Sequence, residues 1–147
     1  MKQPMTWIVL ANGEEVAIYR YEGRSADPVP LPRESFHAPP RAEFADEQGR
    51  SKSRMSTSMH RMAPHSGPDP ELARFAGQIV EHLEEALRKG RFERLVLAAG
   101  PKVLGMIRSE MSDALAKSVC AELDKDLTQY TDRKLRDYLE DKVPAAL

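Results

Sequence analysis

Residues 95–99 (LVLAA) form a short, unbroken apolar run that ends at Gly100-Pro101. A strand without polar alternation is typically buried on both faces, as an inner strand of an α/β sheet is. Proline suits the first turn of a helix, where its missing N–H leaves no hydrogen bond unmade. The run therefore predicts a buried strand that passes directly into a helix, within a domain built from a sheet and packed helices.

The N-terminal part of the chain predicts a β-hairpin. Two runs rich in β-forming residues, 6–11 and 15–21, flank Asn12-Gly13. This dipeptide is a strong hairpin signal because a type I′ turn needs positive φ at both central residues. A third strand is expected within residues 29–36, where prolines restrict it to an edge or a short piece.

The rest of the chain reads mainly as helices. Asp69-Pro70 predicts a capped helix start, apolar residues then recur at helical spacing to Leu87, and Gly90 is expected just after the helix end. Further helices are expected from 101 to 111 and over 132–141. Residues 118–125 fit a strand with Val119, Ala121 and Leu123 on one face, or a continuation of the preceding helix.

These elements predict an α/β protein with a single mixed β-sheet of about five strands and helices packed against it. By length, the 147 residues form one domain, 1–147, interrupted by a long loop at about 37–68. The net charge of −1 argues against non-specific electrostatic binding of the whole protein to nucleic acid or membranes. The chain shows no signal-peptide pattern and no apolar run long enough to span a bilayer, so we expect a soluble, cytoplasmic protein without membrane insertion.

The long loop holds the main candidate binding residues. Residues 48–68 contain arginines, a lysine and two histidines but no acidic residue, in an otherwise slightly acidic protein. Such a segment can contact phosphate groups, while the alternative is a mobile surface loop that lacks aromatic stacking partners. The candidate binding residues are Gln48, Gly49, Arg50, Ser51, Lys52, Arg54 and Arg61.

A secondary candidate is the group Asp124, Lys125 and Asp126, with Asp132 nearby. Carboxylates of this kind could bind Mg²⁺, but a nuclease of the ribonuclease H type also needs an acidic residue in its first strand, and residues 6–11 have none. A solvated strand end is the favoured interpretation, and we predict no metal site, no cofactor and no catalytic residue.

Three other features have structural interpretations. Cys120 is the single cysteine, which excludes an intrachain disulfide, and it is expected to be buried and inert. The four histidines lack metal-ligand spacing. The turn at 98–101 occupies a position where some α/β proteins bind phosphate, but Pro101 removes an amide that such a site would use, so a plain strand-to-helix connection is expected.

Several segments resemble the bacterial family of "host attachment proteins", named as required for attachment to host cells. The matching segments are 6–13 (TWIVLANG), 48–50 (QGR), 74–76 (RFA), 90–97 (GRFERLVL), 101–105 (PKVLG) and 121–128 (AELDKDLT). More distantly, that family resembles the middle domain of archaeo-eukaryotic class-1 release factors and related ribosome-rescue factors. This resemblance implies a ribonuclease H-like, or ribosomal S11–L18-like, arrangement of the sheet.

In release factors the long loop carries a Gly-Gly-Gln tripeptide that enters the peptidyl-transferase centre. The corresponding segment here, 46–54 (DEQGRSKSR), has a single glycine and no such tripeptide. The resemblance therefore implies the fold without the hydrolytic reaction. We expect a non-enzymatic protein that contacts RNA or the ribosome through its basic loop. The alternatives are a cytoplasmic factor indirectly required for host attachment, and a hydrolase that acts through the loop. Homo-oligomerisation is left open.

Overall fold

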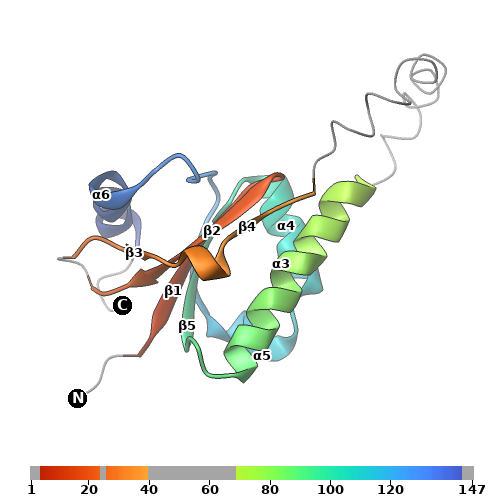
Figure 1. Cartoon of the computed structure of the whole chain (residues 1–147), viewed down its shortest axis with the longest axis horizontal. Coiled ribbons are helices and arrows are strands. Elements are labelled where there is room, and N and C mark those ends of the chain that lie inside the picture. The colour runs from red at the N-terminus through yellow and green to blue at the C-terminus, as the bar shows by residue number, and fades with distance from the viewer. Residues whose placement is uncertain (1–3, 24–25, 40–68, 144–147) are drawn as a thin grey trace, which may run out of the picture.

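The computed structural model describes residues 4–23, 26–39 and 69–143, and its six strands belong to one mixed sheet (Figure 1). The strand order is β3-β2-β1-β5-β6, and β4 pairs with β2 outside that path. The predicted α/β class with a single mixed sheet is therefore confirmed. Most of the long loop, residues 40–68, lies outside the described residues, as do the candidate residues from Gln48 to Arg61.

The predicted hairpin is confirmed as β1 (Thr6–Ala11) and β2 (Glu15–Tyr21), which pair antiparallel. The predicted turn type was wrong. Neither Asn12 nor Gly13 has a positive φ, because the Asn12 side chain accepts hydrogen bonds from the backbone N–H groups of Glu14 and Glu15 and shapes the turn instead. Gly13 has a packing role, since a Cβ there would lie 3.3 Å from Cδ1 of Leu72.

The proline-rich stretch forms two short strands, β3 (Val29–Pro30) and β4 (Phe36–His37), separated by the 3-10 helix η1 (Pro32–Glu34). Both strands pair with β2, and β3 ends the sheet on that side. The expectation of a short edge piece is therefore confirmed, although two strands form where one was expected.

The apolar run forms β5 (Arg94–Ala99), which is parallel to β1 and to β6 (Val119–Leu123). Residues 95–99 are at most 1% exposed, as predicted. The register between β5 and β6 shifts because Leu95 pairs with Val119 and Val96 pairs with Ala121. Cys120 is thus an extra, bulged residue.

This bulge corrects two expectations about β6. Val119 packs on one face of the sheet, while Ala121 and Leu123 pack on the other, so the three residues do not share a face. Cys120 is exposed rather than buried, because β6 is an edge strand and the bulge turns this residue away from both cores. Its thiol donates a hydrogen bond to the carbonyl of Leu95, and partial desolvation raises the pKa of the thiol.

Helix α3 (Pro70–Arg88) begins and ends as its sequence predicts. The Asp69 side chain accepts hydrogen bonds from the first turn of the helix. At the other end Gly90 has a φ of 74°, the N–H of Gly90 donates to the carbonyl of Leu87, and the N–H of Arg91 donates to that of Ala86. This pair of hydrogen bonds is a Schellman motif, which satisfies carbonyls left free at the end of the helix.

The remaining helices are α4 (Pro101–Glu110), α5 (Asp113–Ser118) and α6 (Asp132–Lys142). The region after α4 therefore contains both of the elements that the sequence left as alternatives, a short helix followed by a strand. Helix α5 is capped by Ser112, whose hydroxyl accepts a hydrogen bond from the N–H of Leu115.

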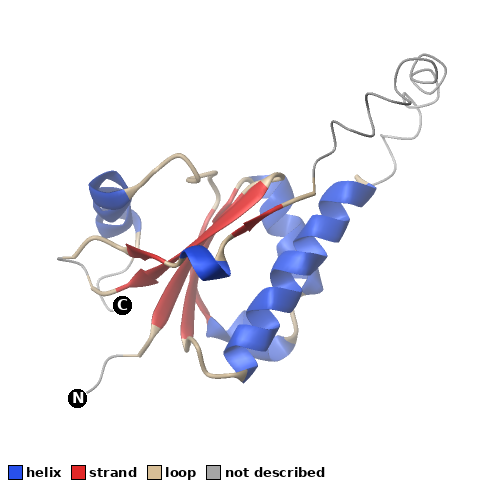
Figure 2. Cartoon of the chain, in the orientation of Figure 1, coloured by secondary structure: helices blue, strands red, loops and turns tan. Residues whose placement is uncertain are grey.

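Helices cover both faces of the sheet (Figure 2). On one face, residues of α3, α4 and α5 pack with Trp7, Val9 and Leu97 around the fully buried Phe92. On the other face, α6 and Leu127 pack with Ile8, Leu10 and Tyr19. Alternate residues of β1 and β5 supply the two cores, and for this reason neither strand shows polar alternation.

Candidate functional site

The three parallel strands β1, β5 and β6 end at the same edge of the sheet, which we call the carboxyl edge. It consists of the Asn12 turn (residues 12–15), Gly100 and the loop 124–131. In open α/β sheets, ligands bind outside the carboxyl ends of the strands. This edge also contains the secondary candidate residues Asp124, Lys125 and Asp126, which are all exposed.

Asn12 joins two parts of the carboxyl edge. Its Oδ1 accepts hydrogen bonds from the N–H groups of Glu14, at 2.8 Å, and Glu15, at 2.9 Å. Its Nδ2 donates to Oγ1 of Thr128, at 3.1 Å, and lies 3.4 Å from Oδ2 of Asp126. A single amide therefore shapes the turn after β1 and attaches it to the loop after β6.

Asp126 is held ionised by its neighbours. Partial burial opposes ionisation, but hydrogen bonds from the hydroxyl and N–H of Thr128, and from Asn12, outweigh it and hold the pKa of Asp126 below its ordinary value. Leu127, between these two polar residues, is fully buried and anchors the loop to the core. Within the described ranges, no three His, Cys, Asp or Glu side chains gather closely enough to hold a metal ion.

The described residues on either side of 40–68 contact the same turn. Where the chain leaves β4, the N–H of Ala38 donates to the carbonyl of Glu14, and His37 lies 3.4 Å from the carboxylate of Glu15. Where the chain returns, Leu72 in the first turn of α3 packs against Gly13. Figure 1 shows the end of β4 and the start of α3 on the same side of the molecule.

A second group of side chains follows the Asp126–Thr128 turn. We call Lys125, Tyr130, Lys134 and Tyr138 the Tyr–Lys cluster. The two tyrosine rings meet edge to face, with centroids 5.5 Å apart. Nζ of Lys125 lies 5.5 Å from the ring centroid of Tyr130 and 5.2 Å from that of Tyr138, and Nζ of Lys134 lies 4.6 Å from that of Tyr130. Both distances to Tyr130 are within cation–π range.

The backbone next to this cluster is strained. Asp132, the first residue of α6, has a φ of 46°, which is the left-handed region that side chains rarely adopt. Aspartate tolerates this region better than most residues, and strained positions often lie near functional sites.

A further charged group lies away from the carboxyl edge. Nε2 of His82 is 2.9 Å from Oε1 of Glu34 without the alignment of a hydrogen bond, and Nη1 of Arg91 is 3.5 Å from the same oxygen. The His82 ring also packs near the rings of Trp7 and Phe36. These contacts attach η1 and β4 to α3, which is a structural role.

Sequence reasoning identified only part of this arrangement. It selected Asp124, Lys125 and Asp126, but it treated Asn12 as a turn residue alone and passed over Thr128, Tyr130, Lys134 and Tyr138. The contact between Asn12 and Thr128 joins residues 116 positions apart, so no local sequence pattern predicts it. The eight-residue spacing of Tyr130 and Tyr138 gives no distinctive signal either.

Comparison with known proteins shows which family the chain is related to. The chain is 34% identical over 70 residues to the uncharacterised protein RP470 of Rickettsia prowazekii, an alignment that covers 46% of this chain and 47% of the relative. The chain thus matches about half the length of that curated relative. None of the described helices is long and apolar enough to cross a membrane. The family model described as "Protein required for attachment to host cells" matches residues 7–139, and the chain therefore belongs to this family.

Proposed function

We propose that the protein binds RNA, or an RNA–protein particle, through the basic segment, residues 48–68. The observation that supports this proposal is that the described residues on either side of 40–68 both contact the Asn12 turn, Ala38 through Glu14 and Leu72 through Gly13. Residues 48–68 carry positive charge without a single acid, and Arg and Lys are the side chains that contact phosphate.

We assign the main phosphate contacts of this proposal to the basic segment. Glu14, Asp124 and Asp126 lie at the carboxyl edge itself, so its described surface is not uniformly basic. The proposed contacts are therefore Arg50, Lys52 and Arg54, with Arg61 beyond them and the small residues Gly49 and Ser51 allowing close approach of a backbone.

The order of elements supports a relation to the middle domain of release factors. A long segment precedes a long helix, α3, which is followed by the apolar strand β5, Gly100 and helix α4. Because the segment lacks Gly-Gly-Gln, we propose binding without hydrolysis of peptidyl-tRNA. We further propose that the protein acts in the cytoplasm, where RNA binding would contribute indirectly to the attachment described for its family.

The test is binding of labelled single-stranded RNA and co-sedimentation with ribosomes over a range of salt concentrations. The variant replaces Arg50, Lys52 and Arg54 together with glutamine. Each lost phosphate contact should reduce the slope of log affinity against log salt by about 0.7, so the triple variant should lose a slope of about 2. The melting temperature should change little if these residues contact only RNA.

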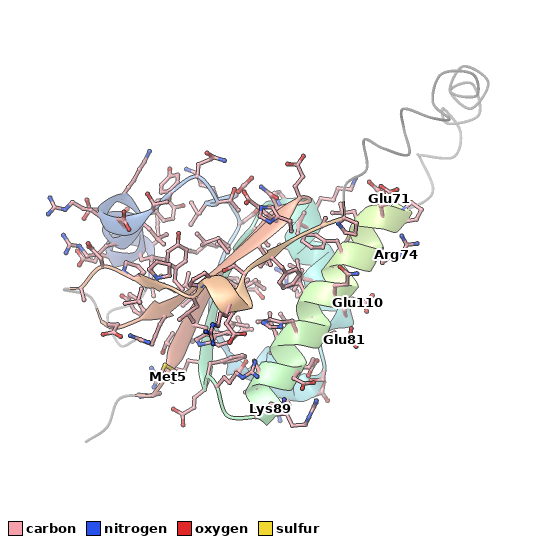
Figure 3. All side chains as sticks on the ribbon, in the orientation of Figure 1. Met5, Glu71, Arg74, Glu81, Lys89 and Glu110 are labelled. Atoms are coloured by element: carbon pink, nitrogen blue, oxygen red, sulfur yellow. The ribbon has the colours of Figure 1, made fainter. Side chains whose placement is uncertain are left out.

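A matched control removes the same number of charges from the opposite edge. Arg88 and Lys89 lie at the C-terminal end of α3, and Lys117 lies in α5 just before β6. Figure 3 shows Lys89 at one end of α3, with Glu71 and Arg74 at the other. The control variant should bind RNA as the wild type does. Equal losses of RNA affinity in both triple variants would show that the effect depends on net charge alone and would contradict a specific role of the basic segment. Absence of RNA and ribosome binding by the wild type would refute the proposal.

A further inference from the structure

The Tyr–Lys cluster has the composition of a single-strand binding surface, and it supplies the aromatic groups that the basic segment lacks. Tyr130 and Tyr138 are half-buried, whereas Lys125 and Lys134 are exposed. The rings therefore pack partly on the core, while the ammonium groups of the two lysines lie over them. Single-strand binders combine cations that follow the backbone with aromatic rings on which bases stack.

Neither lysine of the cluster forms an ion pair with a described residue. Among the described residues, no carboxylate lies within ion-pair distance of Lys125 or Lys134. Two of the neighbouring acids have other contacts: Asp126 accepts hydrogen bonds from Thr128, and Asp137 lies 3.9 Å from Nε of Arg136. The hydrogen bond from Lys125 to the Tyr130 hydroxyl is long, at 3.3 Å, and exposed.

The relevant interactions favour exchange of a lysine for a base. An exposed cation over an aromatic ring interacts weakly with it. A base stacked on an aromatic side chain interacts more strongly. A base can therefore replace an ammonium group over the Tyr130 ring, and the displaced lysine can then pair with the adjacent phosphate.

The cluster is also linked to the residues that flank 40–68. Asn12 contacts Thr128, two residues before Tyr130, and its neighbours Gly13 and Glu14 contact Leu72 and Ala38. The cluster and the two points that flank 40–68 therefore meet at the Asn12 turn.

We propose that the Tyr–Lys cluster is a stacking site for a base of single-stranded RNA, with Tyr130 as the main platform and Lys125 and Lys134 as phosphate contacts. This inference rests on the proposed function. It adds a preference for single strands, because the bases of a duplex are paired and stacked and cannot open onto a tyrosine ring.

The test compares Tyr130→Leu with Tyr130→Phe in the full chain, using a labelled oligouridine 12-mer and an RNA duplex of the same length. Loss of one stacked base, about 1–3 kcal/mol, should weaken oligouridine binding by roughly 5- to 150-fold in the leucine variant. The phenylalanine variant keeps the ring face and should retain the affinity. Duplex binding should respond to neither change, and Lys134→Gln should reduce the salt slope by about 0.7.

The outcomes separate this inference from the proposed function. If the Arg50, Lys52 and Arg54 variant loses RNA binding while Tyr130→Leu binds oligouridine as the wild type does, the proposed function stands and the stacking site is refuted. If the wild type binds no RNA, the proposed function fails, and an NMR titration of the tyrosine ring resonances with AMP then tests the cluster. Shifts of the Tyr130 and Tyr138 resonances in the wild type, with unshifted Tyr138 resonances in Tyr130→Leu, support a nucleobase site. Unchanged resonances in the wild type overturn it.

Discussion

Replacing Asn12 should reveal how strongly one amide joins the carboxyl edge together. Asn12→Ala removes hydrogen bonds to the N–H groups of Glu14 and Glu15 and to the hydroxyl of Thr128, while the contact with Asp126 at 3.4 Å is at the limit of a hydrogen bond. Each hydrogen bond contributes about 0.5–1.5 kcal/mol net, and the turn is partly open to water, so we expect a loss of about 2 kcal/mol. For a domain of this size that corresponds to about 4–8 °C in melting temperature.

The companion variant Asn12→Asp separates the two roles of the side chain. It keeps an acceptor for Glu14 and Glu15, but it places a carboxylate where the amide donated to Thr128 and faced Asp126. The hydrogen bonds to Asp126 lower its pKa in the wild type, so their stabilisation is present above the ordinary aspartate pKa and is lost only as pH falls through the lowered value. Two facing carboxylates in the variant repel each other, which raises the pKa of one of them.

The assay is urea unfolding followed by the fluorescence of Trp7, the single tryptophan, which is 3% exposed. Asn12→Asp should be less stable than the wild type at pH 7, and its deficit should shrink as the pH falls toward about 4, because one carboxylate then becomes protonated. The deficit of Asn12→Ala should change much less. An alanine variant within about 0.5 kcal/mol of the wild type would refute the role of Asn12. A stability deficit of Asn12→Asp that grows as the pH falls would also refute it.

Two further predictions concern local features. Gly90→Ala should destabilise the protein by about 1–2 kcal/mol because the φ of 74° is costly for an L side chain, whereas Gly105→Ala, in the exposed middle of α4, should stabilise it by about 0.5–1 kcal/mol. Urea unfolding of both variants checks this, and effects of the same sign would contradict it. Desolvation raises the pKa of the Cys120 thiol, although Arg94 opposes it, so alkylation by iodoacetamide at neutral pH should be slower in the folded protein than in urea. Equal rates would show that partial desolvation does not raise the pKa of the thiol enough to slow its alkylation.

The local sequence determined most elements of this protein. The apolar run of β5, the Asp69-Pro70 start of α3 and the glycine at its end were predicted where they lie, because burial on two faces, capping and positive φ each depend on a few adjacent residues. The two strands of the hairpin were predicted for the same reason. The turn between them was not, because the Asn12 side chain accepts the hydrogen bonds that a backbone carbonyl would accept in a type I′ turn.

Only the tertiary structure decided which strands pair in which register and which distant residues meet. The bulge at Cys120 depends on how β6 pairs with β5, and a shift of one residue changes which face each side chain occupies. The carboxyl edge depends on the parallel pairing of β1, β5 and β6, which brings Asn12 to Thr128. The Tyr–Lys cluster depends on the packing of α6 and Leu127 against the sheet. Hydrogen bonds and ring contacts act over a few ångströms in space, so their partners become neighbours only when the sheet and helices have packed.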